Sequence, residues 1–201
     1  LIVQACWSCQ GPVAVGEPFC PSCKAVQPPG QADHFQRLGL PRGFEIDTAA
    51  LEKSYFQMQR LLHPDRFATR TPKEKPLSQQ QATSLNDAYE TLKDPLARAA
   101  YLANLMGRDV LKEDGNGPVD PMILMEAMEM REALAEAETA EDVATVTKRA
   151  QGEIADCESE LSDAFAADDL DQAAALITRL KYLRKLADDT RARRAELRGR
   201  G

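Results

Sequence analysis

The fold of this chain is decided by the stretch Leu51-Glu52-Lys53-Ser54-Tyr55-Phe56-Gln57-Met58-Gln59-Arg60-Leu61-Leu62-His63-Pro64-Asp65. Its apolar residues recur at the spacing of one helix face: Leu51, Tyr55, Met58 and Leu62. Pro64 disfavours the helical region at His63, so the helix should end there. A second apolar row predicts a second helix: Leu85, Ala88, Tyr89 and Leu92. The pattern predicts a helical hairpin with a His-Pro-Asp tripeptide in solvent at its tip.

The tripeptide has two interpretations. In isolation, Pro and Asp are ordinary loop residues, and a helix stop followed by a solvated turn explains them. Alternatively, polar residues on a rigid loop that packs against no core indicate side chains that are exposed for binding a partner.

Residues 33 to 106 resemble a J domain, the module that stimulates the ATPase of DnaK-type chaperones. Besides the tripeptide, the matching segments are Leu51-Glu52-Lys53-Ser54-Tyr55, Leu85-Asn86-Asp87-Ala88-Tyr89 and Lys93-Asp94-Pro95-Leu96-Ala97-Arg98. The resemblance implies that His63, Pro64 and Asp65 dock on the chaperone. It also implies that Lys53 and Arg60 are basic contacts on the preceding helix.

Composition is that of ordinary globular material, with 43% hydrophobic and 28% charged residues in 201. The net charge of −7 argues against nucleic acid as the main partner. No apolar run approaches the about 18 residues of a membrane span, so we expect no membrane partner. The chain begins at Leu1 rather than Met, which leaves room for a removed targeting peptide.

Four of the five cysteines form two Cys-x-x-Cys pairs, Cys6 with Cys9 and Cys20 with Cys23. Two such pairs can supply the four thiolates of a structural zinc site, with no position left open for catalysis. We therefore expect one structural zinc ion in a small knuckle that depends on the metal to fold. Two disulfides, a redox-active pair or an iron–sulfur cluster are the alternatives. The fifth cysteine, Cys157, lies on an apolar stripe and should be a buried thiol.

The chain divides into four predicted parts: a zinc module with its linker (1–30), the J-like domain (31–107), a second linker (108–119) and a C-terminal bundle (120–201). Asp47 should cap the helix that ends at His63, and Ser78 the next helix after a loop over 66–77. Asp94-Pro95 should begin a further helix that ends at Gly107. The predicted fold class is all-α.

The bundle should contain three antiparallel helices with short connections. The first begins at Asp120-Pro121, and the second follows a capping box at Thr139 and ends near Ala166. The third runs from about Leu170 to Ala195, capped by Asp168 or Asp169, and should bury Ala173, Ile177, Leu180 and Leu183.

The helix from Pro121 to Glu138 carries more apolar side chains than one buried face needs. One row suffices for the bundle: Ile123, Ala127, Met130, Leu134 and Ala137. The surplus consists of Leu124, Met125 and Met128, with Glu129, Glu132 and Glu136 beside them. A small apolar patch with an acidic edge is typical of a transient partner surface, although a neighbouring segment could equally cover it. Tyr182 lies off the buried stripe of the last helix and could join this patch.

From Asp33 onward the whole chain resembles the HscB-type (Jac-type) co-chaperones. The matching segments are Ile123-Leu124-Met125-Glu126-Ala127-Met128-Glu129-Met130-Arg131-Glu132-Ala133-Leu134 and Leu180-Lys181-Tyr182-Leu183-Arg184-Lys185-Leu186. Members deliver the iron–sulfur scaffold IscU to its dedicated chaperone, HscA or a mitochondrial equivalent. The resemblance implies that the scaffold binds Leu124, Met125, Met128, Glu129, Glu132, Glu136 and Tyr182.

Two features depart from many members. Tyr182 and Met128 stand where many members have Phe and Leu, and both changes keep bulk. The tetracysteine looks like that of animal mitochondrial members, so the expected compartment is the bacterial cytoplasm or, alternatively, the mitochondrial matrix. Both are reducing enough for thiolates to remain metal ligands.

The leading hypothesis is a non-enzymatic co-chaperone for iron–sulfur cluster transfer. A general J-domain protein for unfolded clients and a Cys-x-x-Cys thiol redox protein are the alternatives.

Overall fold

The computed structural model describes residues 3–67, 71–110 and 120–198. The chain forms two compact units, Leu1–Ala97 and Arg98–Gly201. Helices dominate, and the strands in the described ranges are β1 (Val3–Ala5) and β2 (Pro12–Ala14). The all-α prediction with a small N-terminal knuckle is confirmed.

The N-terminal knuckle is built from two similar turns beside a short antiparallel ribbon. Strands β1 and β2 pair with Val3 opposite Ala14. In each turn the residue after the second cysteine, Gln10 or Lys24, adopts a positive φ. Its N–H donates to the carbonyl of the first cysteine at 3.0 Å, to Cys6 in one turn and to Cys20 in the other. Both turns therefore fold their cysteine side chains toward one point.

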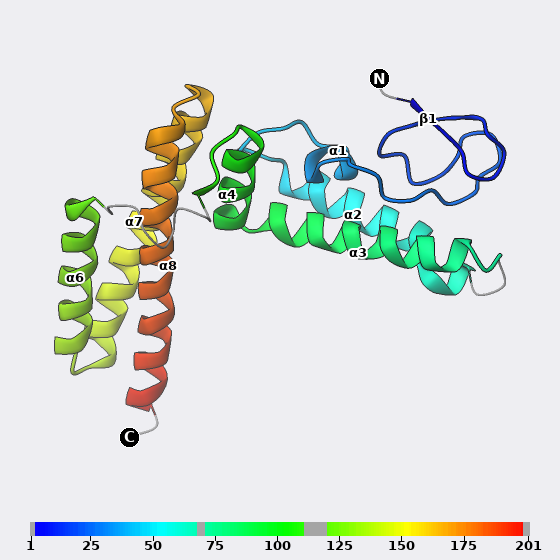
Figure 1. The fold of residues 1–201 in the computed structure, drawn as a ribbon. Coiled ribbons are helices and arrows are strands. Elements are labelled where there is room, and N and C mark those ends of the chain that lie inside the picture. Colours follow the sequence, from blue (N-terminus) through cyan, green and yellow to red (C-terminus); the bar gives the residue numbers. More distant parts are fainter. Residues whose placement is uncertain (1–2, 68–70, 111–119, 199–201) are drawn as a thin grey trace. The chain divides into compact units, whose positions relative to one another are not determined.

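The first unit continues as a helical hairpin (Figure 1). Its elements are α1 (His34–Leu38), α2 (Thr48–Leu62), the 3₁₀ turn η1 (Pro64–Phe67) and α3 (Glu74–Lys93). Asp47 caps α2 as predicted, because its carboxylate accepts the N–H of Ala50 at 3.0 Å. The buried core includes Phe35, Leu38, Leu51, Leu62, Leu85 and Leu92. Tyr55 of α2 stacks on Tyr89 of α3, with ring centroids 4.0 Å apart.

The predicted loop over 66–77 was wrong at both ends. Residues up to Phe67 belong to η1, and α3 begins at Glu74. Pro76 lies in the first turn of α3, where no N–H is needed for an intrahelical bond. Ser78 is not a cap: it is fully buried inside α3, and its hydroxyl donates to the carbonyl of Lys75.

Helix α4 (Pro95–Leu105) has the predicted ends. The Asp94 carboxylate accepts the N–H of Ala97 at 2.8 Å, and Pro95 is the first helical residue. Gly107 follows the helix with φ +97°, a conformation that glycine adopts without strain. Most of the predicted linker over 108–119 lies outside the described residues.

The second unit contains three long helices, α6 (Pro121–Glu136), α7 (Ala140–Ala166) and α8 (Leu170–Arg198). Asp120 caps α6, and Thr139 and Asp142 form the capping box of α7. Asp169 accepts the N–H of Gln172 near the start of α8, while Asp168 adopts φ +54°. The interior is apolar and contains Met130, Val143, Ala150, Cys157, Leu161, Ile177, Leu180 and Leu183. None of the helices in these described ranges is both long and apolar enough to cross a membrane.

Candidate functional sites

The His-Pro-Asp tripeptide sits where α2 ends. His63 leaves the helical region, with φ −57° and ψ 128°, as expected for a residue before proline. The side chains of His63 and Asp65 are 56% and 90% exposed. The N–H of Asp65 donates to Nδ1 of His63 at 3.3 Å, and the N–H of Arg66 donates to the His63 carbonyl at 3.0 Å. The loop therefore presents both side chains to solvent on a backbone fixed by local bonds.

One face of α2 continues this exposed surface. Lys53 and Arg60 are exposed and lie seven residues apart, which places them on the same side of the helix. Phe56 lies between them on that side and is 50% exposed, and Leu61 is 44% exposed. Sequence reasoning missed these two apolar residues. The sequence did carry a signal for them: both are large apolar residues that lie off the apolar row of α2 formed by Leu51, Tyr55, Met58 and Leu62.

The four N-terminal cysteines form a compact cluster. Their sulfur atoms all lie within 4.8 Å of one another, with Cys6 to Cys23 and Cys9 to Cys20 both at 3.7 Å. Four thiolates around one zinc ion, each about 2.3 Å from the metal, would lie about 3.8 Å apart. Cys6 and Cys20 are buried, whereas Cys9 and Cys23 are exposed. The cluster therefore has the residue types and dimensions of a four-sulfur metal site.

Hydrogen bonds prepare the buried sulfurs for ligation. Burial would raise the pKa of Cys6, but the backbone N–H groups of Cys9 and Ser8 and the nearby thiols outweigh it and lower that pKa to about 6. The backbone N–H of Cys23 likewise lowers the pKa of Cys20 against the effect of burial. The amide Nε2 of Gln27, itself buried, also donates to the Cys6 sulfur at 3.3 Å. Thiolate is the ligand form, so these donors favour ligation by Cys6 and Cys20. At Cys9 the backbone N–H of Gly11 lowers the pKa, but the neighbouring thiols and burial outweigh it and raise that pKa to about 11.

The surplus apolar side chains of α6 are exposed. Leu124, Met125 and Met128 are 40%, 56% and 61% exposed. The carboxylates beside them are exposed too: Glu129, Glu132 and Glu136. We call these six residues the α6 patch. Of the predicted buried row, Ile123, Met130, Leu134 and Ala137 are buried, whereas Ala127 is only partly buried.

Tyr182 is only partly exposed. It lines a small cavity between α6 and α8, together with Ala127, Met130 and Arg131 of α6. Tyr182 therefore lies against the helix that carries the patch.

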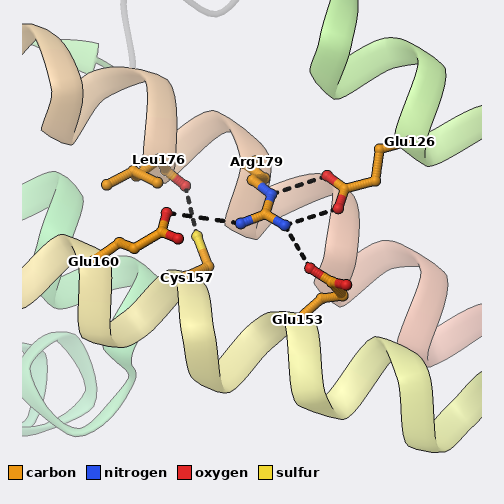
Figure 2. A network of polar contacts seen from close by, with 6 residues as sticks. All are labelled: Glu126, Glu153, Cys157, Glu160, Leu176 and Arg179. Carbon is orange, nitrogen blue, oxygen red and sulfur yellow. Dashed lines mark hydrogen bonds and ion pairs between the residues drawn. The ribbon is translucent and has the colours of Figure 1, made fainter.

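A polar network fixes α6 to the other two helices, and sequence reasoning missed it (Figure 2). The guanidinium of Arg179 on α8 donates two bonds to Glu126 on α6, at 2.9 and 2.7 Å. It also pairs with Glu153 on α7 and, at 3.8 Å, with Glu160 two turns further along the same face of α7. The bond to Arg179 outweighs burial and lowers the pKa of the Glu126 carboxyl.

Cys157 adjoins this network in Figure 2. Its thiol is fully buried and donates to the carbonyl of Leu176 at 3.4 Å. Burial raises its pKa to about 11. The prediction of a buried thiol is confirmed.

Comparison with known proteins supports this organisation. A DnaJ domain model matches residues 33–101, and a model of the HSCB C-terminal oligomerisation domain matches residues 119–191. The human iron–sulfur cluster co-chaperone protein HscB is 37% identical over 199 residues, which cover 96% of this chain and 83% of the human protein.

Solved structures of HscB-type and Jac1 co-chaperones have a similar fold. The crystal structure of human co-chaperone protein HscB is similar with a TM-score of 0.85 and 34% identity, covering 94% of this chain and 98% of that one. The Jac1 co-chaperone from Saccharomyces cerevisiae is similar with a TM-score of 0.63 and 27% identity, covering 75% and 86%.

A J domain followed by this type of C-terminal domain defines a J-domain co-chaperone, which is not itself an enzyme. The chain belongs to the HscB family of iron–sulfur cluster co-chaperones.

Proposed function

We propose that this protein stimulates the ATPase of an HscA- or DnaK-type chaperone and delivers an IscU-type iron–sulfur scaffold to it. Stimulation is assigned to His63, Pro64 and Asp65, with Lys53 and Arg60 as basic contacts on α2. Scaffold binding is assigned to the α6 patch and Tyr182. The function belongs to a reducing compartment, the bacterial cytoplasm or alternatively the mitochondrial matrix.

The observation that carries the proposal is the exposed α6 patch. Three large apolar side chains are exposed on a helix whose opposite row buries Ile123, Met130 and Leu134 in the bundle. Exposed apolar surface edged by carboxylates favours a specific partner over solvent. Its small size favours one folded scaffold over the extended apolar segments of unfolded clients, so a general J-domain protein is the weaker candidate.

The α6 patch assignment is tested by scaffold binding. Isothermal titration with purified IscU compares the parent with Leu124→Ala/Met125→Ala/Met128→Ala. Because these side chains are exposed, the variant should fold normally and lose about ten-fold or more in affinity. Val3→Ala is the control, because Val3 is an exposed apolar residue of the knuckle, outside the α6 patch. Equal affinities for the triple variant and the parent would contradict the assignment.

The loop assignment is tested by steady-state ATP hydrolysis by the chaperone. His63→Gln should abolish stimulation, because it removes the imidazole that the loop presents. The matched control is His34→Gln, the same change at the other histidine of the chain, which should keep stimulation. Stimulation by His63→Gln equal to that of the parent would contradict the proposal.

We further propose that the four-cysteine cluster binds one structural zinc ion. The donor set and its spacing support this, since two of the sulfur separations are 3.7 Å, close to the about 3.8 Å of tetrahedral zinc, and all lie within 4.8 Å. Cys6, Cys9, Cys20 and Cys23 would all be ligands, and the metal would cross-link the two turns without taking part in a reaction.

A further inference from the structure

The knuckle packs on the residue that ends the His-Pro-Asp turn. The ring of Phe19 stacks on the ring of Phe67, with centroids 6.5 Å apart and planes 14° apart. Phe67 is the last residue of η1, two positions after Asp65, and is 6% exposed. The knuckle therefore supplies an aromatic partner that helps to hold this buried ring in place.

A second contact holds the other end of the segment between η1 and α3. The ammonium of Lys73 lies over the indole of Trp7, 4.5 Å from its centroid. Lys73 immediately precedes α3. The indole in turn is fixed, because its Nε1 donates to the carbonyl of Val26 at 2.7 Å. Phe67 at the end of η1 and Lys73 just before α3 thus each contact an aromatic residue of the knuckle.

Each aromatic is the chain neighbour of a buried cysteine of the cluster. Trp7 follows Cys6, and Phe19 precedes Cys20. The position of either ring therefore depends on where its neighbouring cysteine is held. In the knuckle the buried core cluster consists of Cys6, Val13 and Cys20, which is too little apolar material to maintain the fold unaided.

A buried hydrogen-bond path joins the cluster to α3 as well. Gln27 donates from Nε2 to the Cys6 sulfur, and its backbone carbonyl accepts Nε2 of Gln81 at 2.9 Å. Gln81 lies in α3 and accepts from Arg37 of α1 at 3.2 Å. Both glutamines are buried, at 1% and 2% exposure. The knuckle is thus joined to the hairpin by polar and aromatic contacts together.

We propose that Phe19 and Trp7 are positioning residues for the His-Pro-Asp loop, and that metal binding by the knuckle is coupled through them to chaperone activation. The inference rests on the loop function proposed above. With the metal bound, the two rings hold Phe67 and Lys73, and the backbone from His63 to Phe67 keeps its binding geometry. Without the metal, the loop must be ordered when the chaperone binds, at a cost in affinity.

The direct test is amide hydrogen exchange in the full-length protein. Peptides covering residues 61–67 report the N–H groups of Asp65 and Arg66, whose bonds define the turn. We expect faster exchange there after chelation of the metal and in metal-loaded Phe19→Ala. Val3→Ala is the control, because Val3 is an exposed apolar residue of the same knuckle, and it should leave exchange unchanged. Unchanged exchange in both the chelated protein and Phe19→Ala would overturn the proposal.

Lys73→Gln is a second variant for the same exchange experiment, to be used if Phe19→Ala does not retain the metal. Lys73 is exposed and lies outside the knuckle, so its replacement should leave the metal site intact. This variant loses the contact with Trp7 and should also accelerate exchange in the turn. An intact metal site with unchanged exchange in Lys73→Gln would then overturn the proposal.

The functional test is the concentration of co-chaperone that gives half-maximal ATPase stimulation. Phe19→Ala with metal bound should raise it by between about two-fold and about twelve-fold, the range set by one aromatic pair. The maximal rate at saturation should be kept. An unchanged concentration for Phe19→Ala overturns the inference while leaving the loop function intact. Full stimulation by His63→Gln overturns the proposed role of the His-Pro-Asp loop in ATPase stimulation. In that case the hydrogen-exchange experiment still tests whether metal binding by the knuckle orders the loop.

Discussion

Replacement of Arg179 by Met should strongly destabilise the C-terminal bundle at neutral pH. The Arg179 side chain is 18% exposed, and the side chains of Glu126 and Glu153 are 23% and 30% exposed. Met fills a similar volume but leaves these carboxylates without the guanidinium that bridges them. Removing one partner of a buried ion pair costs about 3–5 kcal/mol. Because these groups are partly solvated, we expect a smaller cost than this, about 2–3 kcal/mol.

The pH dependence of this loss follows from the pKa of Glu126. In the parent, Arg179 lowers this pKa below its unfolded value, so the stabilisation is present above about pH 4.3 and is lost as pH falls further. In Arg179→Met, the lowering of the Glu126 pKa by Arg179 is lost, and Glu126 and Glu153 repel each other while both are charged. Protonation then relieves the repulsion as pH falls. The deficit of the variant should be full at pH 7 and should shrink toward pH 4.

Native-state hydrogen exchange of the slowest amides of α7 and α8 measures this free energy for the bundle by itself. The matched control is Arg191→Met, which breaks an exposed pair with Asp188 and should cost less than about 1 kcal/mol. An Arg179→Met protein within about 0.5 kcal/mol of the parent at pH 7 would refute the reasoning, given the ±0.5 kcal/mol expected of ordinary surface changes. A deficit of equal size at pH 4 and pH 7 would refute the electrostatic cause.

Three further predictions concern single features. Chelation of the metal should shift the fluorescence emission of Trp7, the only tryptophan, to longer wavelength. The far-ultraviolet circular dichroism should remain that of a helical protein. An unchanged fluorescence spectrum would show that the knuckle folds without metal. Asp47→Ala should lower the stability of the first unit by about 1 kcal/mol in hydrogen exchange of α2 and α3, and no loss would mean that the cap to Ala50 contributes nothing. Leu161→Ala, at a fully buried position, should cost the bundle about 2–5 kcal/mol by the same method, whereas a cost below about 1 kcal/mol would indicate a loosely packed core.

Local signals predicted most of the helix ends. Asp47, Asp94, Asp120 and Thr139 each cap the helix that follows, because a cap depends on residues within one turn of it. The start of α3 was missed although its signal was present. Thr71 and Glu74 exchange side-chain and backbone hydrogen bonds in the Thr-x-x-Glu pattern of a capping box. Pro76 was interpreted as part of a loop, whereas a proline is compatible with a first turn.

Side-chain contacts between segments that are distant in the chain could not be predicted from the sequence. Nothing in the spacing of Phe19 and Phe67, or of Arg179 and Glu126, indicates that these residues meet. The four cysteines are different, because a Cys-x-x-Cys pair is itself a local geometric unit. The surplus face of α6 was also predictable, since helical periodicity alone separates Ile123 and Met130 from Met125 and Met128.

The central claim is that one chain brings the scaffold to the chaperone by using two separate sites. It is tested most directly by chaperone ATPase rates with IscU present and absent, for the parent and for Leu124→Ala/Met125→Ala/Met128→Ala. The account predicts that the triple variant keeps the stimulation seen without IscU but loses the additional increase that IscU produces with the parent, because the linked sites no longer raise the local concentration of scaffold. An equal increase with IscU for both proteins would contradict it.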